Sequence, residues 1–152
     1  MFVLHFQHYQ SWAQSMQRHF ALVLWFFVSA AGAQTQYSSD LSASFDSFRS
    51  LMTRAERTSL SNKAGLLAIQ AEAFELHKKA ASIGSEAAQA ELALVRSGEP
   101  HDKNLLLVSA AADALVLAKK LLDYYLFTGD KAFLSQATAV AQIGRRLKAS
   151  VR

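Results

Sequence analysis

Few residues in this chain have the types and spacing that metal or cofactor chemistry requires. Beyond residue 33 the chain has only two histidines, His77 and His101, and the whole chain has no cysteine. The lack of cysteine excludes a thiolate zinc site, an iron–sulfur cluster, covalent haem attachment and a cysteine nucleophile. Neither histidine has a second histidine or a glutamate at the three- or four-residue spacing of a helical metal site. We therefore expect no metal, haem or other cofactor.

The sequence also lacks the patterns of the common catalytic groups. It contains no GxSxG motif, and its six glycines are isolated, so no glycine-rich phosphate loop is formed. Asp113 stands in the apolar run SAAADALVLA, but helical projection places it on one narrow polar stripe with Ser109 and Lys120. We expect Asp113 to be a solvated carboxylate rather than a buried acid. Because no catalytic constellation is found, we do not expect an enzyme.

One pair of polar residues departs from this pattern. Gln70 and His77 lie one heptad apart, in the middle of the apolar face of a predicted helix. Polar groups buried on such a face need hydrogen-bond partners or carry a desolvation penalty. Tyr124, Tyr125 or a carbonyl at a neighbouring helix end could supply them, which would make the pair structural. Alternatively, this face lines a groove or cavity that receives a ligand or partner, or His77 acts as an active-site base. Gln70 and His77 are the candidate ligand or partner contacts.

Every long periodic segment of the chain predicts an α-helix. Apolar residues recur at three- and four-residue steps, and no long segment alternates as a strand would. Gly84 separates the second and third predicted helices, and Gly98 with Pro100 ends the third. The resulting fold is an all-α antiparallel bundle of four to five helices. The predicted helices cover residues 39–57, 62–83, 86–97, 103–127 and 131–148.

Local residues predict how these helices begin and end. Ser59 or Ser61 is available to cap the helix that starts near residue 62, and Asp102 and Asp130 can cap the last two helices. Gly129 can take the left-handed conformation that ends a helix. Short connections of this kind place consecutive helices side by side and antiparallel.

Three further features concern packing. The segment 103–127 is apolar almost all round, which predicts a central helix that is buried on most sides. Gly144 lies on the apolar stripe of the last helix, where its cost in helix propensity indicates a close approach to a neighbouring helix. Asp46 and Arg49 are three residues apart and are expected to pair on the solvent side of the first helix.

The first 33 residues have the pattern of a secretory signal peptide. Residues 20–33 are apolar and uncharged, and Arg18 carries the only formal charge before them. This run is shorter than the roughly 20 residues that a membrane-spanning helix needs. Ala31 and Ala33 give the small-x-small form of a cleavage site before Gln34. Retention of the segment as an uncleaved anchor is the alternative.

Cleavage would leave residues 34–152 as a single helical-bundle domain. The true start of translation could be Met16, since a leader that begins there has ordinary signal-peptide proportions. The chain has 51% hydrophobic and 18% charged residues and one proline, which favours a packed globule over disorder. Its formal net charge of +4 is spread along the sequence, so no nucleic-acid partner is expected.

These observations predict an exported protein, periplasmic or extracellular, that acts as a macromolecule-binding module. It would serve as an adaptor, inhibitor, chaperone or accessory subunit for another protein or envelope component, and would meet the membrane only transiently through its signal peptide. The alternative is a small-ligand carrier with a site between helices near Gln70 and His77. A carrier should enclose a mostly apolar cavity, whereas a binding module should expose a contiguous apolar patch.

Overall fold

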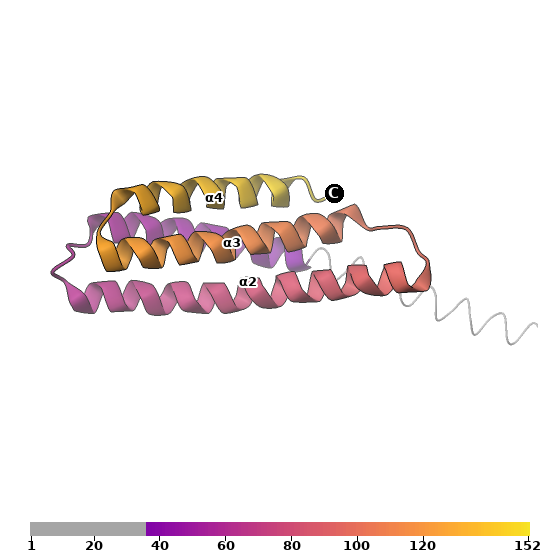
Figure 1. Ribbon diagram of the computed structural model, residues 1–152, viewed down its shortest axis with the longest axis horizontal. Helices are drawn as coiled ribbons and strands as arrows, with labels where there is room; N and C mark the ends of the chain where they lie inside the picture. Colours follow the sequence, from indigo (N-terminus) through magenta and orange to yellow (C-terminus); the bar gives the residue numbers. More distant parts are fainter. Residues whose placement is uncertain (1–35) are drawn as a thin grey trace, which may run out of the picture. The chain divides into compact units, whose positions relative to one another are not determined.

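The computed structural model describes residues 36–152, and within them it contains four helices and no strand (Figure 1). The first helix runs through residues 36–57 and is called helix 36–57 below. It is followed by α2 (Lys63–Ser97), α3 (Lys103–Thr128) and α4 (Lys131–Ala149). The all-helical prediction is confirmed for this part of the chain. The predicted leader, with Ala31, Ala33 and Gln34, lies outside the described residues.

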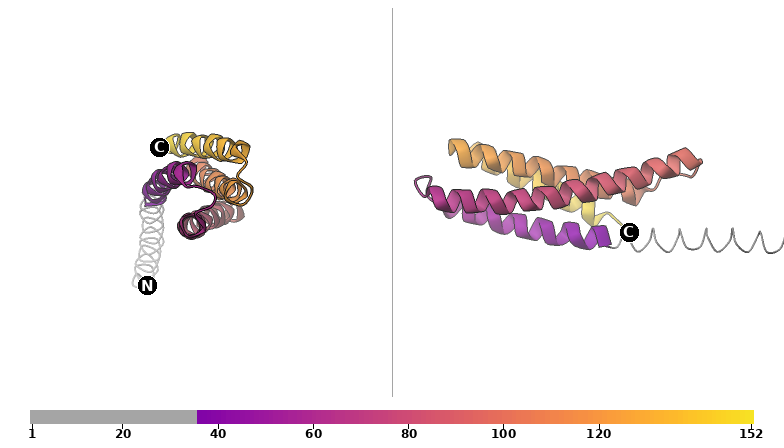
Figure 2. Two further views of the ribbon diagram at one scale, coloured as in Figure 1. Left: turned by 90° about the vertical axis from the view of Figure 1, so that its left-hand side faces the viewer. Right: turned by 90° about the horizontal axis from the view of Figure 1, so that it is seen from below.

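Helix α3 lies between two other helices, but the prediction that it is buried on most sides is wrong, because an outer row that includes Leu106, Leu117 and Phe127 is exposed. It packs along α2 on one side and α4 on the other, and the end-on view in Figure 2 shows it between them. It also contacts helix 36–57, where the Tyr125 hydroxyl donates to the carbonyl oxygen of Ala55 at 3.4 Å. The turns that join α2 to α3 and α3 to α4 are short, so consecutive helices run antiparallel.

Two ion pairs join helix 36–57 to α2. Lys79 Nζ lies 2.9 Å from Asp40 Oδ1, and Arg54 donates two hydrogen bonds to the Glu72 carboxylate at 2.6 and 2.9 Å. The later residue of helix 36–57 thus meets the earlier residue of α2, as antiparallel helices require. All four side chains are exposed at the surface.

The Arg54–Glu72 pair leads to a pH-dependent prediction. The hydrogen bonds from Arg54 lower the pKa of Glu72 below its ordinary value of 4.5. Because the folded-state pKa is lower than the unfolded one, the pair stabilises the fold above the unfolded value and loses this effect as pH falls through the folded value. In Arg54→Met, NMR titration should show the pKa of Glu72 raised toward 4.5. The stability difference between wild type and variant should shrink on acidification. A Glu72 pKa that does not move would contradict the prediction.

The expected pairing of Asp46 with Arg49 is wrong. Asp46 instead forms an ion pair with Arg145 of α4. The reason is geometric, because α4 packs along helix 36–57 at this level and brings a guanidinium within reach. The three-residue spacing that favoured Arg49 contains no information about Arg145, which lies 99 residues away in the sequence.

The core is formed by large side chains of helix 36–57 and by many alanines of α2 and α3. The alanines allow the helix axes of α2 and α3 to approach closely. The core residues with the largest fully buried side chains are Leu41, Phe45, Phe48, Ile69, Val108, Leu115 and Leu122.

The predicted break at Gly84 is wrong, and the two helices expected over 62–83 and 86–97 are one. Helix α2 continues through Gly84 to Ser97 and ends at Gly98, which takes the left-handed conformation with φ 76°. Gly84 is buried against α3, and a Cβ added to it would lie 3.1 Å from the Cβ of Ala112. This glycine therefore permits close contact between two helices and does not end one.

The predicted caps of the last two helices are confirmed. The Asp102 carboxylate accepts from the backbone N–H of Asn104 at 2.8 Å, and the Asp130 carboxylate accepts from that of Ala132 at 2.9 Å. Gly129 ends α3 with φ 73°. These features were predictable because a cap depends on a few consecutive residues.

Helix α2 is capped by Asn62 rather than by Ser59 or Ser61. The Asn62 side-chain oxygen accepts from the backbone N–H of Gly65 at 3.0 Å. The two serine hydroxyls instead hydrogen-bond each other at 2.8 Å within the preceding turn. The helix begins one residue later than the sequence pattern indicated.

Glu91 of α2 is the single buried charged side chain within residues 36–152, with 6% of its surface exposed. Nothing in the local sequence around Glu91 indicated this burial. One carboxylate oxygen lies 2.5 Å from Nδ1 of His101, and the other accepts from the backbone N–H of Asp102 at 2.9 Å. The His101 side chain is itself 72% exposed in its turn. Glu91 thus fastens the α2–α3 turn to the end of α2.

Replacement of Glu91 should destabilise this end of the bundle. Glu91→Leu removes the acceptor of the Asp102 N–H and of His101, and we expect the free energy of unfolding to fall by about 1–3 kcal/mol. Glu91→Gln keeps an acceptor oxygen and should cost less. Urea denaturation of both variants tests this order. If Glu91→Leu unfolds at the same urea concentration as wild type, the contacts of Glu91 with the α2–α3 turn contribute nothing to stability.

Candidate functional site

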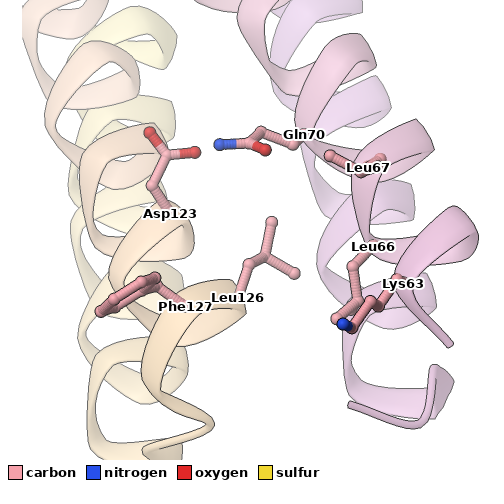
Figure 3. Close-up of a pocket in the computed structure, with 7 residues that line it drawn as sticks. All are labelled: Lys63, Leu66, Leu67, Gln70, Asp123, Leu126 and Phe127. Atoms are coloured by element: carbon pink, nitrogen blue, oxygen red, sulfur yellow. The ribbon is translucent and has the colours of Figure 1, made fainter. Parts of the chain in front are cut away.

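An open groove of about 270 Å³ lies between the first half of α2 and the second half of α3, and it is called the α2–α3 groove below (Figure 3). Its walls combine apolar side chains with a lysine, an amide and a carboxylate. Leu67 and Phe127 on its rim are 64% and 90% exposed. The residues that line it are Lys63, Leu66, Leu67, Gln70, Asp123, Leu126 and Phe127.

An exposed apolar line extends along α2 from the wall of the groove. Leu67 on this wall and Phe74 beyond it are 64% and 49% exposed. The buried face of α2 in this region is narrow and is made by Ile69, Ala73 and Ala80. Since 67 and 74 are one heptad apart, both project from the same side of the helix, away from this face. α2 therefore has an apolar line that the described part of the chain leaves uncovered.

The structure separates the two candidate contacts. Gln70 is exposed and lines the α2–α3 groove, where its side chain and that of Asp123 extend toward one another in Figure 3. His77 is half-buried one heptad further along α2 and is not among the lining residues. Its ring stacks on Phe74 with a centroid distance of 6.2 Å and an interplanar angle of 16°. The His77 Nδ1 atom is buried and has no hydrogen-bond partner within residues 36–152.

The tyrosines that could have satisfied this pair bind elsewhere. Tyr125 donates to the backbone of Ala55, as described above. The Tyr124 ring is 57% exposed and stacks on Phe133 of α4, with a centroid distance of 5.4 Å. The interpretation of Gln70 and His77 as a core pair satisfied by Tyr124 or Tyr125 is therefore wrong.

Sequence reasoning missed a charged cluster beside the groove. Lys119 Nζ lies 2.5 Å from Asp123 Oδ2, and these side chains are 12% and 30% exposed. Lys119 and Lys78 both lie over the Phe74 ring, at 5.6 and 5.5 Å from its centroid. The other Asp123 oxygen is buried and has no hydrogen-bond partner in the described part of the chain. The four-residue spacing of Lys119 and Asp123 in the sequence could have predicted their ion pair.

A second groove, of about 380 Å³, lies between helix 36–57 and α4. Its apolar floor is made by Phe45, Phe48 and Met52, which are all buried, and its rim includes Arg49 and Arg145. Arg145 is held by its ion pair with Asp46. Two exposed large apolar side chains, Leu67 and Phe127, line the α2–α3 groove, whereas none lines this second groove, which makes the α2–α3 groove the stronger candidate.

Two wider features of the chain bear on its chemistry. No group of three or more His, Cys, Asp or Glu side chains placed to hold a metal ion occurs within residues 36–152. None of the helices in these residues is long and apolar enough to cross a membrane.

Comparison with known proteins finds no significant match to this chain among family models, curated proteins or solved structures.

Proposed function

We propose that this chain is an exported helical protein that acts by binding another macromolecule through the α2–α3 groove. The observation that supports the proposal is the pair of exposed apolar side chains, Leu67 and Phe127, that line the groove. Large apolar side chains that gather at one place on a surface mark interaction sites more often than scattered ones do. The groove is open to solvent, so it suits a side chain inserted by a partner better than an enclosed small molecule.

The chemistry of the groove indicates what kind of partner it fits. Its apolar walls would receive the leucine or aromatic side chains of an amphipathic helix. Lys63 lines the groove and forms no ion pair within residues 36–152. Basic side chains next to an apolar groove favour acidic residues on the partner. The proposed partner is thus a protein segment with an apolar face and acidic flanks.

Affinity capture with matched baits tests this function. The purified protein, Leu67→Glu and Leu92→Glu would each be used as bait on the cell-envelope fraction. Leu92 is a suitable control because it is also an exposed leucine of α2, at 46% exposure, but lies outside the groove. We expect the same partner with wild type and Leu92→Glu, and at least about tenfold less with Leu67→Glu. Equal recovery with all three baits would contradict binding in the groove.

The second candidate function is a small-ligand carrier, which Gln70 in the groove and the unpaired His77 Nδ1 favour. Native mass spectrometry of the purified protein distinguishes it from the first. A carrier should show an added mass that is lost in Gln70→Ala or His77→Ala while the melting temperature stays nearly unchanged. A binding module should show the mass of the polypeptide alone.

Export is a separate part of the proposal and has its own test. Cleavage between Ala33 and Gln34 predicts that the protein recovered from the periplasm or medium begins at Gln34. N-terminal sequencing of this protein checks the position. A sequence that begins at Met1 or Met16 would contradict cleavage and support an uncleaved anchor.

A further inference from the structure

The outer side of α3 has a stripe of exposed, mostly apolar residues, and the stacking of Tyr124 on Phe133 of α4 leaves most of it uncovered by the described helices. Leu106, Leu117, Tyr124 and Phe127 are 48%, 49%, 57% and 90% exposed. Every position of the stripe is exposed, and we call it the outer α3 stripe. It consists of Leu106, Ala110, Asp113, Leu117, Lys120, Tyr124 and Phe127.

The spacing of these residues is that of a helix–helix contact. Successive members of the outer α3 stripe are four and three residues apart in strict alternation, which is the pattern of the apolar positions in paired helices. The opposite side of α3 faces the core through Leu105, Val108, Leu115 and Leu122. α3 therefore carries two apolar faces, and the bundle in residues 36–152 accounts for one.

The two charges in the outer α3 stripe identify what covers it. Asp113 is exposed, as predicted, and neither Asp113 nor Lys120 forms an ion pair within residues 36–152. They lie seven residues apart, at equal distances from a point between residues 116 and 117. A second α3 running antiparallel across this point places Asp113 of each copy opposite Lys120 of the other. A parallel second copy would place like charges together, which repel.

The remaining members of the outer α3 stripe agree with the same arrangement. Leu106 comes opposite Phe127, since both are ten to eleven residues from the central point. Tyr124 comes opposite Ala110, so that a large side chain meets a small one. Leu117 lies at the centre and meets its own counterpart. An interface in which residue i contacts residue j and j contacts i is the isologous contact of a two-fold dimer.

We propose that two copies of this chain associate through the outer α3 stripe as an antiparallel, two-fold symmetric dimer. The proposal goes beyond the binding function above, because it uses the outer side of α3 and a second copy of the chain. Phe127 is shared by the two surfaces. Leu67 belongs to the α2–α3 groove alone, and Asp113 and Lys120 belong to the outer α3 stripe alone.

Charge reversal tests both the contact and its direction. Sedimentation velocity of the purified protein should show reversible dimerisation as concentration rises. Asp113→Lys and Lys120→Asp each place like charges opposite one another twice, so each should raise the dissociation constant at least about tenfold. The double variant Asp113→Lys/Lys120→Asp recreates both pairs and should restore the dimer. Glu56→Lys is the control, because it makes the same charge change at an exposed position of helix 36–57.

Cysteine cross-linking provides an independent measurement, since the chain has no cysteine of its own. Leu117→Cys lies at the proposed two-fold axis and should form a disulfide-linked dimer under mild oxidation. Leu106→Cys alone should remain unlinked, whereas a mixture of Leu106→Cys and Phe127→Cys should form a mixed dimer. These positions are exposed, so circular dichroism should show an unchanged helical fold.

Several results would overturn the proposal. A protein that stays monomeric as its concentration is raised has no such interface. A dimer that tolerates both single charge reversals, or that the double variant does not restore, is formed by another surface. Rapid self-linking of Leu106→Cys would show parallel helices. Because Leu67→Glu should leave dimerisation intact, failure of the dimer and failure of the groove function are distinguishable.

Discussion

Gly144→Leu should lower the free energy of unfolding by about 1–3 kcal/mol, because the cost of overpacking this helix crossing exceeds the roughly 1 kcal/mol gained in helix propensity when glycine is replaced. Gly144 is buried in α4 where this helix meets helix 36–57 and α3. A Cβ added there would lie 2.5 Å from Cζ of Phe45 and 2.9 Å from Cβ of Ala114. Phe45 is 2% exposed and closely packed, and an alanine Cβ can move only with its backbone. The new side chain therefore has to push α4 away from its neighbours.

Chemical denaturation of Gly144→Leu, Gly144→Ala and Ala139→Leu measures this effect. Ala139 is an exposed residue of α4, so Ala139→Leu enlarges a side chain at a position without this crowding and should change stability by less than about 0.5 kcal/mol. Gly144→Ala should fall between the two, because its Cβ already makes the short contacts. An increase in stability for Gly144→Leu would show that the crossing is loosely packed.

The comparison of Gly144 with Gly84 shows which parts of this fold were predictable. The close approach at Gly144 follows from sequence because the glycine stands within a continuous apolar stripe. Gly84 is followed by a serine and separates two stripes, a pattern that fits a helix end equally well. Ala112, a residue of α3, decides between the two interpretations, and the local sequence around Gly84 contains no sign of it. Caps such as Asp102 and Asp130 were predictable since their bonds stay within three residues.

The candidate site was predictable only in part for a related reason. The sequence shows that Leu67 and Phe74 are apolar and one heptad apart on α2, but it could not show whether another helix would cover them. The position of α3 leaves them exposed and brings Asp123 to face Gln70 across the groove. The burial of Glu91 could not be predicted from the local sequence either, since it depends on the turn that contains His101. The incorrect prediction for Gly84 and the unpredicted burial of Glu91 both concern residues whose surroundings are set by another segment of the chain.

Phe45→Ala should lower the free energy of unfolding by about 3–5 kcal/mol, the usual cost of removing a buried phenylalanine ring. The ring is among the largest fully buried side chains of the core and fills the space above Gly144. Glycine cannot supply atoms to close the resulting cavity, so little relaxation is expected. Thermal and urea unfolding, followed by circular dichroism, measure the loss. A cost below about 1 kcal/mol would mean that the neighbouring helices collapse into the space.

The double variant Phe45→Ala/Gly144→Leu examines whether the two residues form one contact. Removal of the ring clears the atom that lies closest to a Cβ at residue 144, so the new leucine can enter the cavity. We expect the double variant to be more stable than the sum of the single effects predicts, by about 1–3 kcal/mol. The contact with Ala114 remains, so the rescue should be incomplete. Strict additivity of the two single effects would show that Phe45 and Gly144 do not pack against each other, and that α4 approaches helix 36–57 at another level.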